Sequence, residues 1–127
     1  MKNYVKIAGV LAVIALTATA VVMLLTYFKN NSIDSGVERY RNTPGAVLID
    51  VRTEEEYAEG HIPGSVNIPL QSIQDIGTVA EDKLTPLFVY CRSGRRSGEA
   101  ETLLKEAGYT NVYNIGGIID YSGKLER

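Results

Sequence analysis

The pattern of apolar and polar positions divides the chain into two parts of unlike character. From Ile7 to Phe28 no residue is charged. A helix over these residues, rising 1.5 Å per residue, is about 33 Å long and can span a bilayer core of roughly 30 Å. Because the segment is apolar on every side, and the rest of the chain is too small to enclose it, we do not expect it to be a buried core helix.

The flanks of this run are typical of a secretory signal, with Lys2 and Lys6 before the apolar segment. Residues 18–20 (Ala-Thr-Ala) offer a cleavage site, but the run continues to Phe28, further than cleaved signals usually extend. We therefore expect residues 1–28 to be an uncleaved membrane anchor, with a cleaved signal peptide as the alternative. Positive charge is nearly balanced across the run and leaves the orientation open. The signal-like layout predicts a domain outside the cytoplasm, membrane-anchored or, after cleavage, periplasmic or secreted.

After a polar linker at residues 29–36, the pattern predicts one domain over residues 37–127. Apolar runs at 46–50 and 86–91 lack polar alternation, which is typical of strands covered on both faces, and residues 111–115 are predicted to be a third strand. A shorter strand is predicted near 65–68 and helices over 34–42, 53–60 and about 94–107, while 70–82 is ambiguous. This alternation predicts an α/β fold with a small, mainly parallel sheet flanked by helices.

Local signals set several boundaries. Thr53 and Glu56 have the spacing of a capping box. Asp34 or Ser35 is the expected N-cap of the first helix of the domain. Residues 116–117 (Gly-Gly) are expected to break the last strand.

Charge and residue counts exclude several classes of function. The formal net charge is −2, and removing Lys2 and Lys6 with the first 28 residues makes the remainder more acidic. An acidic domain is not expected to bind nucleic acid. With one cysteine and one histidine, the chain offers no internal disulfide and no Cys/His metal site, and we expect no cofactor.

The single cysteine, Cys91, stands at the carboxyl end of a predicted buried strand and just before a helix, where open α/β sheets bind ligands. Gly94 lets the following backbone curl so that successive N–H groups point at the sulfur, a nest that favours an anion. Arg92, Arg95 and Arg96 favour the thiolate in the same way. This context indicates a reactive nucleophile rather than a structural thiol.

Three stretches of the sequence resemble the rhodanese family, and the short exported phage-shock rhodaneses of bacterial envelopes most of all. They are residues 48–52 (LIDVR), 60–69 (GHIPGSVNIP) and 89–97 (VYCRSGRRS), and residues 108–117 match the family's tail pattern. The resemblance implies a thiosulfate sulfurtransferase with Cys91 as catalytic nucleophile. Its thiolate would take the outer sulfur of a donor such as thiosulfate as a persulfide and pass it to cyanide or a thiol.

The resemblance also implies roles for the neighbouring residues. The substrate-binding set is Arg92, Ser93, Gly94, Arg95, Arg96 and Ser97. Asp50, Arg52 and His61 are implied to be structural support, and Tyr121 is a candidate for the bulky aromatic that many members carry after the double glycine.

Other functions remain as alternatives. Cysteine phosphatases and arsenate reductases of related fold carry an arginine six positions after the cysteine, where this chain has Ser97, so that chemistry is disfavoured. A non-catalytic membrane-tethered binding module is the main alternative. A redox carrier would need a partner thiol, since no second cysteine is present. The expected partners are a small sulfur donor, its acceptor and the membrane, and the domain is expected to be a monomer.

Overall fold

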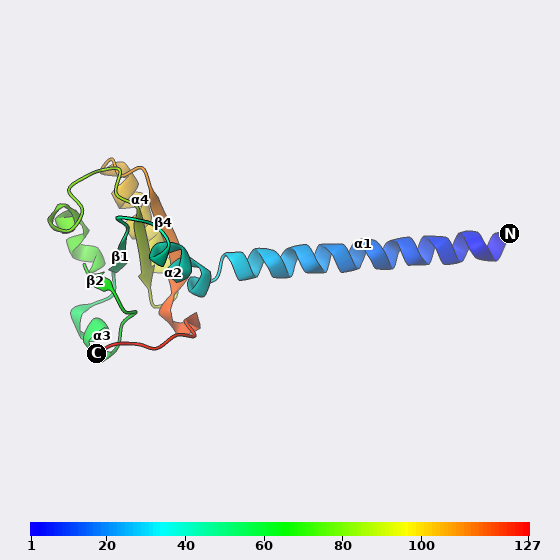
Figure 1. Ribbon diagram of the computed structural model, residues 1–127, viewed down its shortest axis with the longest axis horizontal. Helices are drawn as coiled ribbons and strands as arrows, with labels where there is room; N and C mark the ends of the chain where they lie inside the picture. The colour runs from blue at the N-terminus through cyan, green and yellow to red at the C-terminus, as the bar shows by residue number, and fades with distance from the viewer. The chain divides into compact units, whose positions relative to one another are not determined.

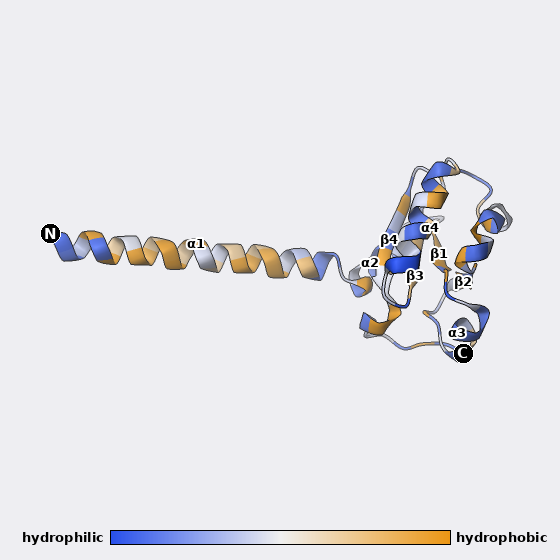
Figure 2. Cartoon of the chain, turned by 180° about the vertical axis from the view of Figure 1, so that it is seen from behind, coloured by the Kyte–Doolittle hydropathy of each residue, from blue (hydrophilic) through white to orange (hydrophobic).

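The computed structural model describes residues 1–127 and divides into two compact units, Met1–Asn31 and Ser32–Arg127. The first unit is the helix α1 (Lys2–Asn30), the blue to cyan helix of Figure 1. None of its residues is buried. Apolar residues cover most of its length, and hydrophilic ones lie at its ends (Figure 2). By length and composition it could cross a membrane, a test that a signal sequence also passes.

The threonine side chains of α1 form hydrogen bonds within the helix itself. The Thr17, Thr19 and Thr26 hydroxyls each donate to a backbone carbonyl three or four residues earlier, at 2.8–2.9 Å. Because no water is present in a bilayer core, such internal bonding suits a helix in apolar surroundings.

The second unit is built on one four-stranded sheet in the order β2-β1-β3-β4, in which all pairings are parallel. The strands are β1 (Val47–Asp50), β2 (Ser65–Asn67), β3 (Leu87–Cys91) and β4 (Val112–Gly117). The predicted α/β class with a mainly parallel sheet is therefore confirmed.

Helices cover both faces of this sheet. Leu48, Phe88 and Tyr90 pack in a cluster with residues of α2 (Ile33–Arg41), and the 3₁₀ helix η2 (Ile118–Asp120) adds Ile118. The opposite faces of the same strands pack against α4 (Arg95–Glu106) and the 3₁₀ helix η1 (Leu70–Thr78). The short helix α3 (Glu54–Glu59) follows β1, and the capping box predicted at Thr53 and Glu56 is present.

The first helix of the domain begins earlier than the sequence suggested. Ser32, and not Asp34 or Ser35, is the N-cap, and its hydroxyl accepts from the Ser35 N–H at 3.2 Å. Ile33 and Gly36 are buried, so residues 33–36 belong to α2 instead of a linker. The Asp34 carboxylate instead accepts from Ser122, near the C-terminus, an interaction that no local pattern could reveal.

The double glycine does not break the last strand, contrary to expectation. β4 continues through both residues, and Cys91 pairs with Gly117. A Cβ on Gly117 would come within 2.2 Å of the Arg92 carbonyl oxygen. Gly117 is therefore needed because the segment after Cys91 lies directly on β4.

Candidate active site

Cys91 is the last residue of β3 and is buried, with 1% of its surface exposed. Its side chain belongs to the cluster on the α4 face of the sheet. Tyr90 points to the other face, where its hydroxyl accepts from the Ile62 N–H at 3.1 Å. The alternation of side chains along the strand thus turns the sulfur toward the start of α4.

The segment after Cys91 wraps around the sulfur. The Gly94 N–H donates to Sγ at 3.0 Å, and the Ser97 hydroxyl lies 3.4 Å from it. Gly94 has a φ of 99° and is the N-cap of α4, so a residue with a side chain would be strained there. The predicted nest of donors at the helix N-terminus is present.

These contacts decide the ionisation of the thiol. Burial alone raises the pKa of Cys91, but hydrogen bonds from the Ser97 hydroxyl and from the Ser97, Gly94 and Ser93 amides lower it more. The net pKa lies below the ordinary value of a thiol. A lowered thiol pKa and hydrogen-bond donors that point at the sulfur together favour a nucleophilic cysteine.

The three arginines of the segment have different surroundings. Arg92 and Arg95 are exposed. Arg96 instead makes a bidentate ion pair with Glu56 of α3, at 2.7 and 3.0 Å. The Cys91 thiolate and Arg96 still interact electrostatically. The pair with Glu56 spans 40 positions that the local sequence does not connect.

Asp50 and Arg52 form a closed pair at the end of β1. The Arg52 guanidinium donates to both Asp50 carboxylate oxygens at 2.7–3.1 Å and to the Gly60 carbonyl at 2.7 Å. Both side chains are nearly or fully buried. The pair ties the strand end to the end of α3.

His61 lies in a similar structural setting. Its ring stacks on Tyr57 with 3.7 Å between centroids, and Nδ1 is 3.0 Å from the Tyr57 carbonyl oxygen. Its backbone pairs with Glu126 through two hydrogen bonds of 2.9 Å. These contacts join the turn after α3 to the C-terminus of the chain.

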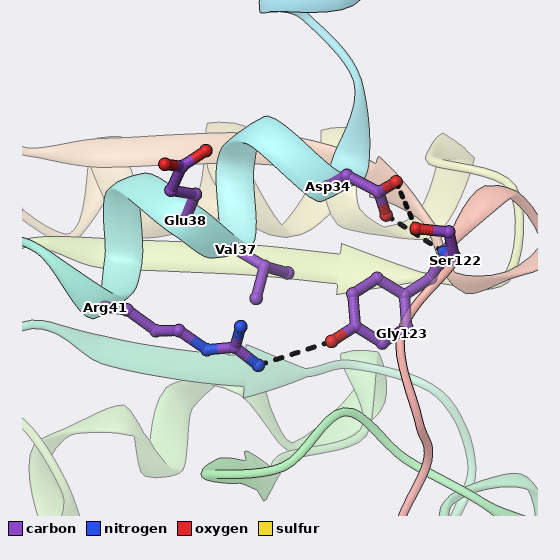
Figure 3. A pocket seen from close by; sticks show the side chains of 7 residues that line it. Asp34, Val37, Glu38, Arg41, Ser122 and Gly123 are labelled. Carbon is purple, nitrogen blue, oxygen red and sulfur yellow. Dashed lines mark hydrogen bonds between the residues drawn. The ribbon is translucent and has the colours of Figure 1, made fainter.

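Tyr121 packs against the α2 side of the domain. Its hydroxyl accepts from Arg41 at 3.3 Å, and it lines an open hollow of about 360 Å³ with Asp34, Val37 and Glu38 (Figure 3). It also packs against the cluster on the α2 face, which is the face opposite to Cys91. This position gives it contacts with α2 rather than with the sulfur.

Asn114 of β4 is a site residue that the sequence reading missed. Its carboxamide contacts both Gly94 and Ser97. The only signal in the sequence is a polar residue inside an otherwise apolar strand, which is too weak to single it out.

Comparison with known proteins agrees with this geometry. The family model of the rhodanese-like domain matches residues 35–124. The chain belongs to the rhodanese family. The Escherichia coli thiosulfate sulfurtransferase PspE is 47% identical over 73 residues, which cover 57% of this chain and 70% of PspE. The thiosulfate:glutathione sulfurtransferase of Saccharomyces cerevisiae is 37% identical over 84 residues, and the match spans 60% of that protein.

Solved structures show the same family fold. A rhodanese with anions from E. coli superposes with a TM-score of 0.61 and 41% identity, covering 65% of this chain and 98% of that one. The rhodanese-like domain protein of Staphylococcus aureus gives 0.64 at 28% identity, over 75% and 93% of the two chains. The expectation of a rhodanese-type enzyme acting in sulfur transfer is confirmed by these relatives.

Proposed function

We propose that this rhodanese moves sulfane sulfur from a donor such as thiosulfate to a thiophilic acceptor through a persulfide on Cys91. The hydrogen bonds from Gly94 and Ser97 to Sγ carry the proposal, because they stabilise the same negative charge in the thiolate and, one bond further out, in the persulfide. Two relatives are named for thiosulfate, and the E. coli structure was solved with anions.

In the first half-reaction the Cys91 thiolate attacks the outer sulfur of thiosulfate. A bond forms between Sγ and that sulfur, the original S–S bond of the donor breaks, and sulfite leaves with the electron pair. The exposed Arg92 and Arg95 are the groups that would bind the dianionic donor and the departing sulfite.

In the second half-reaction the acceptor attacks the outer sulfur of the persulfide. Cyanide gives thiocyanate and a thiolate gives a persulfide, while the Cys91 thiolate leaves and is regenerated. The charge on sulfur is the same before and after the cycle, so no general base is required. His61, held by Tyr57 and Glu126, has no step assigned to it.

Steady-state kinetics of the full chain in mild detergent test this scheme. Varying thiosulfate at several cyanide concentrations should give parallel double-reciprocal lines, as a ping-pong cycle requires. A single turnover without acceptor should release one sulfite per Cys91. Intersecting lines, with no sulfite before cyanide is added, would contradict a covalent intermediate.

We further propose that residues 1–28 anchor the domain, as a monomer, outside the cytoplasm. The apolar surface and internally bonded threonines of α1 support this proposal. Mass analysis of the protein purified from membranes would show an intact N-terminus for an anchor and a start near residue 21 for a cleaved signal.

A further inference from the structure

Asn114 lies where β4 loses its regular pairing with β3. Val89 pairs with Asn114, but the next residue, Tyr90, pairs with Gly116, so Ile115 is an extra residue in β4. Such bulges re-aim a side chain, and they are frequent beside active sites. The Asn114 backbone N–H is bound by the Glu101 carboxylate of α4 at 2.6 Å.

The Asn114 carboxamide bonds to the residues that themselves contact the sulfur. Its Nδ2 donates to the Gly94 carbonyl at 3.0 Å. Its Oδ1 accepts from the Ser97 hydroxyl at 2.7 Å and from the Gly116 N–H at 3.1 Å. Gly94 and Ser97 both offer hydrogen bonds to Sγ.

The Ser97 hydroxyl has one proton and two acceptors within reach. The Asn114 oxygen is at 2.7 Å and the Cys91 sulfur at 3.4 Å. When Cys91 is protonated, its S–H can donate to the Ser97 oxygen while the hydroxyl donates to Asn114. When the sulfur is anionic, the hydroxyl can turn to it, and Asn114 keeps the Gly116 N–H. The carboxamide oxygen therefore has a donor in both states.

We propose that Asn114 is a positioning residue of the sulfur-transfer reaction, which fixes the Gly94 carbonyl and competes with the Cys91 sulfur for the hydrogen bond of the Ser97 hydroxyl. It has no contact with the reacting sulfur itself and acts through Ser97 and Gly94. As a role in catalysis, this inference rests on the proposed function. The effect on the thiol can be measured without any sulfur donor.

The test is the pH profile of Cys91 alkylation by iodoacetamide in the full-length protein. Asn114→Asp keeps the size of the side chain but makes Oδ1 a stronger acceptor and adds a negative charge two hydrogen bonds from the sulfur. In Asn114→Asp the midpoint of the alkylation profile should rise by about one pH unit. Below the midpoint, alkylation of Cys91 should then be about tenfold slower. The matched control is Asn111→Asp, because the Asn111 amide donates to the Leu84 carbonyl, beyond the opposite end of β4.

A second comparison separates transmission through the hydroxyl from direct electrostatics. In the Ser97→Ala background, Asn114→Asp should raise the midpoint less than it does with Ser97 present. Equal shifts in the two backgrounds, or a shift no larger than that of Asn111→Asp, would overturn the proposal. The charges that face this region are common to every variant: Arg96 with Glu56, Asp50 with Arg52, and Glu101 with Lys105.

A measurement on the wild-type chain avoids any folding defect of a variant. In a pH titration followed by NMR, the Asn114 side-chain amide signals should shift with the same midpoint as the ionisation of Cys91, while those of Asn111 stay constant. Asn114 signals that do not respond to the ionisation of Cys91 would refute the inference. If these tests succeed but thiosulfate transfers no sulfur, the proposed function fails and the coupling of Asn114 to the thiol stands.

Discussion

Two neighbouring strands end at the same edge of the sheet, and the negative charge at each strand end is stabilised in a different way. β1 ends at Asp50 and β3 at Cys91, and the two strands pair directly. After β1, the buried Asp50 carboxylate is neutralised by Arg52, whose guanidinium also bonds to the Gly60 carbonyl. After β3, the sulfur receives hydrogen bonds from Gly94 and Ser97, but no side chain neutralises it in a direct ion pair.

The difference separates a structural site from a chemical one. A charge whose partner is built into the fold is closed to ligands, and breaking such a pair is costly. An anionic sulfur that is stabilised by backbone dipoles and nearby cations can accept and release a second sulfur atom without rearranging the fold. The same sheet edge thus supports stability at β1 and reactivity at β3.

Breaking the closed pair should have the largest effect. Arg52→Ala leaves the Asp50 carboxylate buried without its partner, and the free energy of unfolding should fall by about 3–5 kcal/mol. Urea unfolding of the full chain in detergent, followed by tyrosine fluorescence, measures it. Arg92→Ala removes an exposed arginine directly after the end of β3 and should change stability by less than about 0.5 kcal/mol. Similar losses in both variants would remove the contrast between the two strand ends.

Gly117→Ala should disturb the Cys91 site by displacing the backbone of the segment that follows Cys91. The added Cβ would come within 2.2 Å of the Arg92 carbonyl oxygen, so the segment around the sulfur must move. We expect a loss of about 1–3 kcal/mol in stability and a larger relative loss of sulfur transfer. The control is Gly77→Ala, because nothing lies within 4 Å of a Cβ there. Full activity in Gly117→Ala would show that the segment is not held as described.

Glu56 links the two strand ends, and its effect should depend on pH. Its hydrogen bond with Arg96 holds the pKa of the carboxyl at about 2, against an ordinary value of 4.5. Because the folded-state pKa is depressed, the stabilisation is present above pH 4.5 and is lost as the pH falls toward 2. Glu56→Gln should cost about 1 kcal/mol at neutral pH and progressively less below pH 4.5. A cost that is the same at pH 7 and pH 3 would argue against the ion pair, and Glu55→Gln, on the exposed side of α3, is the control.

Removing one donor from the sulfur should have the smallest effect on stability. Ser97→Ala should raise the pKa of Cys91 toward its ordinary value and move the alkylation profile to higher pH. A depressed thiol pKa contributes stability above the ordinary thiol pKa and loses it as the pH falls through the folded value. At neutral pH the cost should therefore be about 1 kcal/mol or less, from the lost hydrogen bonds. Ser93→Ala keeps its backbone amide and should shift the profile less.

The Cys91 site could largely be predicted from the sequence, because the residues that indicate it lie close together in the chain. An apolar strand, a cysteine, a glycine and three arginines lie within 12 consecutive positions, 86–97. A structural role for Asp50 and Arg52 was expected from the resemblance to the rhodanese family. Glu56 and Asn114 were not found as site residues, because their contacts cross 17 to 40 positions and depend on how helices pack on the sheet.

The strand boundaries show the same limit. A break in the last strand was expected at Gly116 and Gly117 because glycines often end strands. In the fold they instead allow β4 to pack closely against the backbone of the segment that follows Cys91. The start of α2 was misplaced because Ile33 and Gly36 become part of the helix through burial against the domain, including close approach of Gly36 to Ile115.

The most direct test of persulfide formation on Cys91 is the intact mass of the full chain after incubation with thiosulfate. We expect a gain of one sulfur atom that disappears on adding cyanide and is absent in Cys91→Ser. No gain from thiosulfate, mercaptopyruvate or a persulfide donor, in protein whose Cys91 is still alkylated readily, would contradict persulfide chemistry. A non-catalytic binding module would then be the better description of the domain.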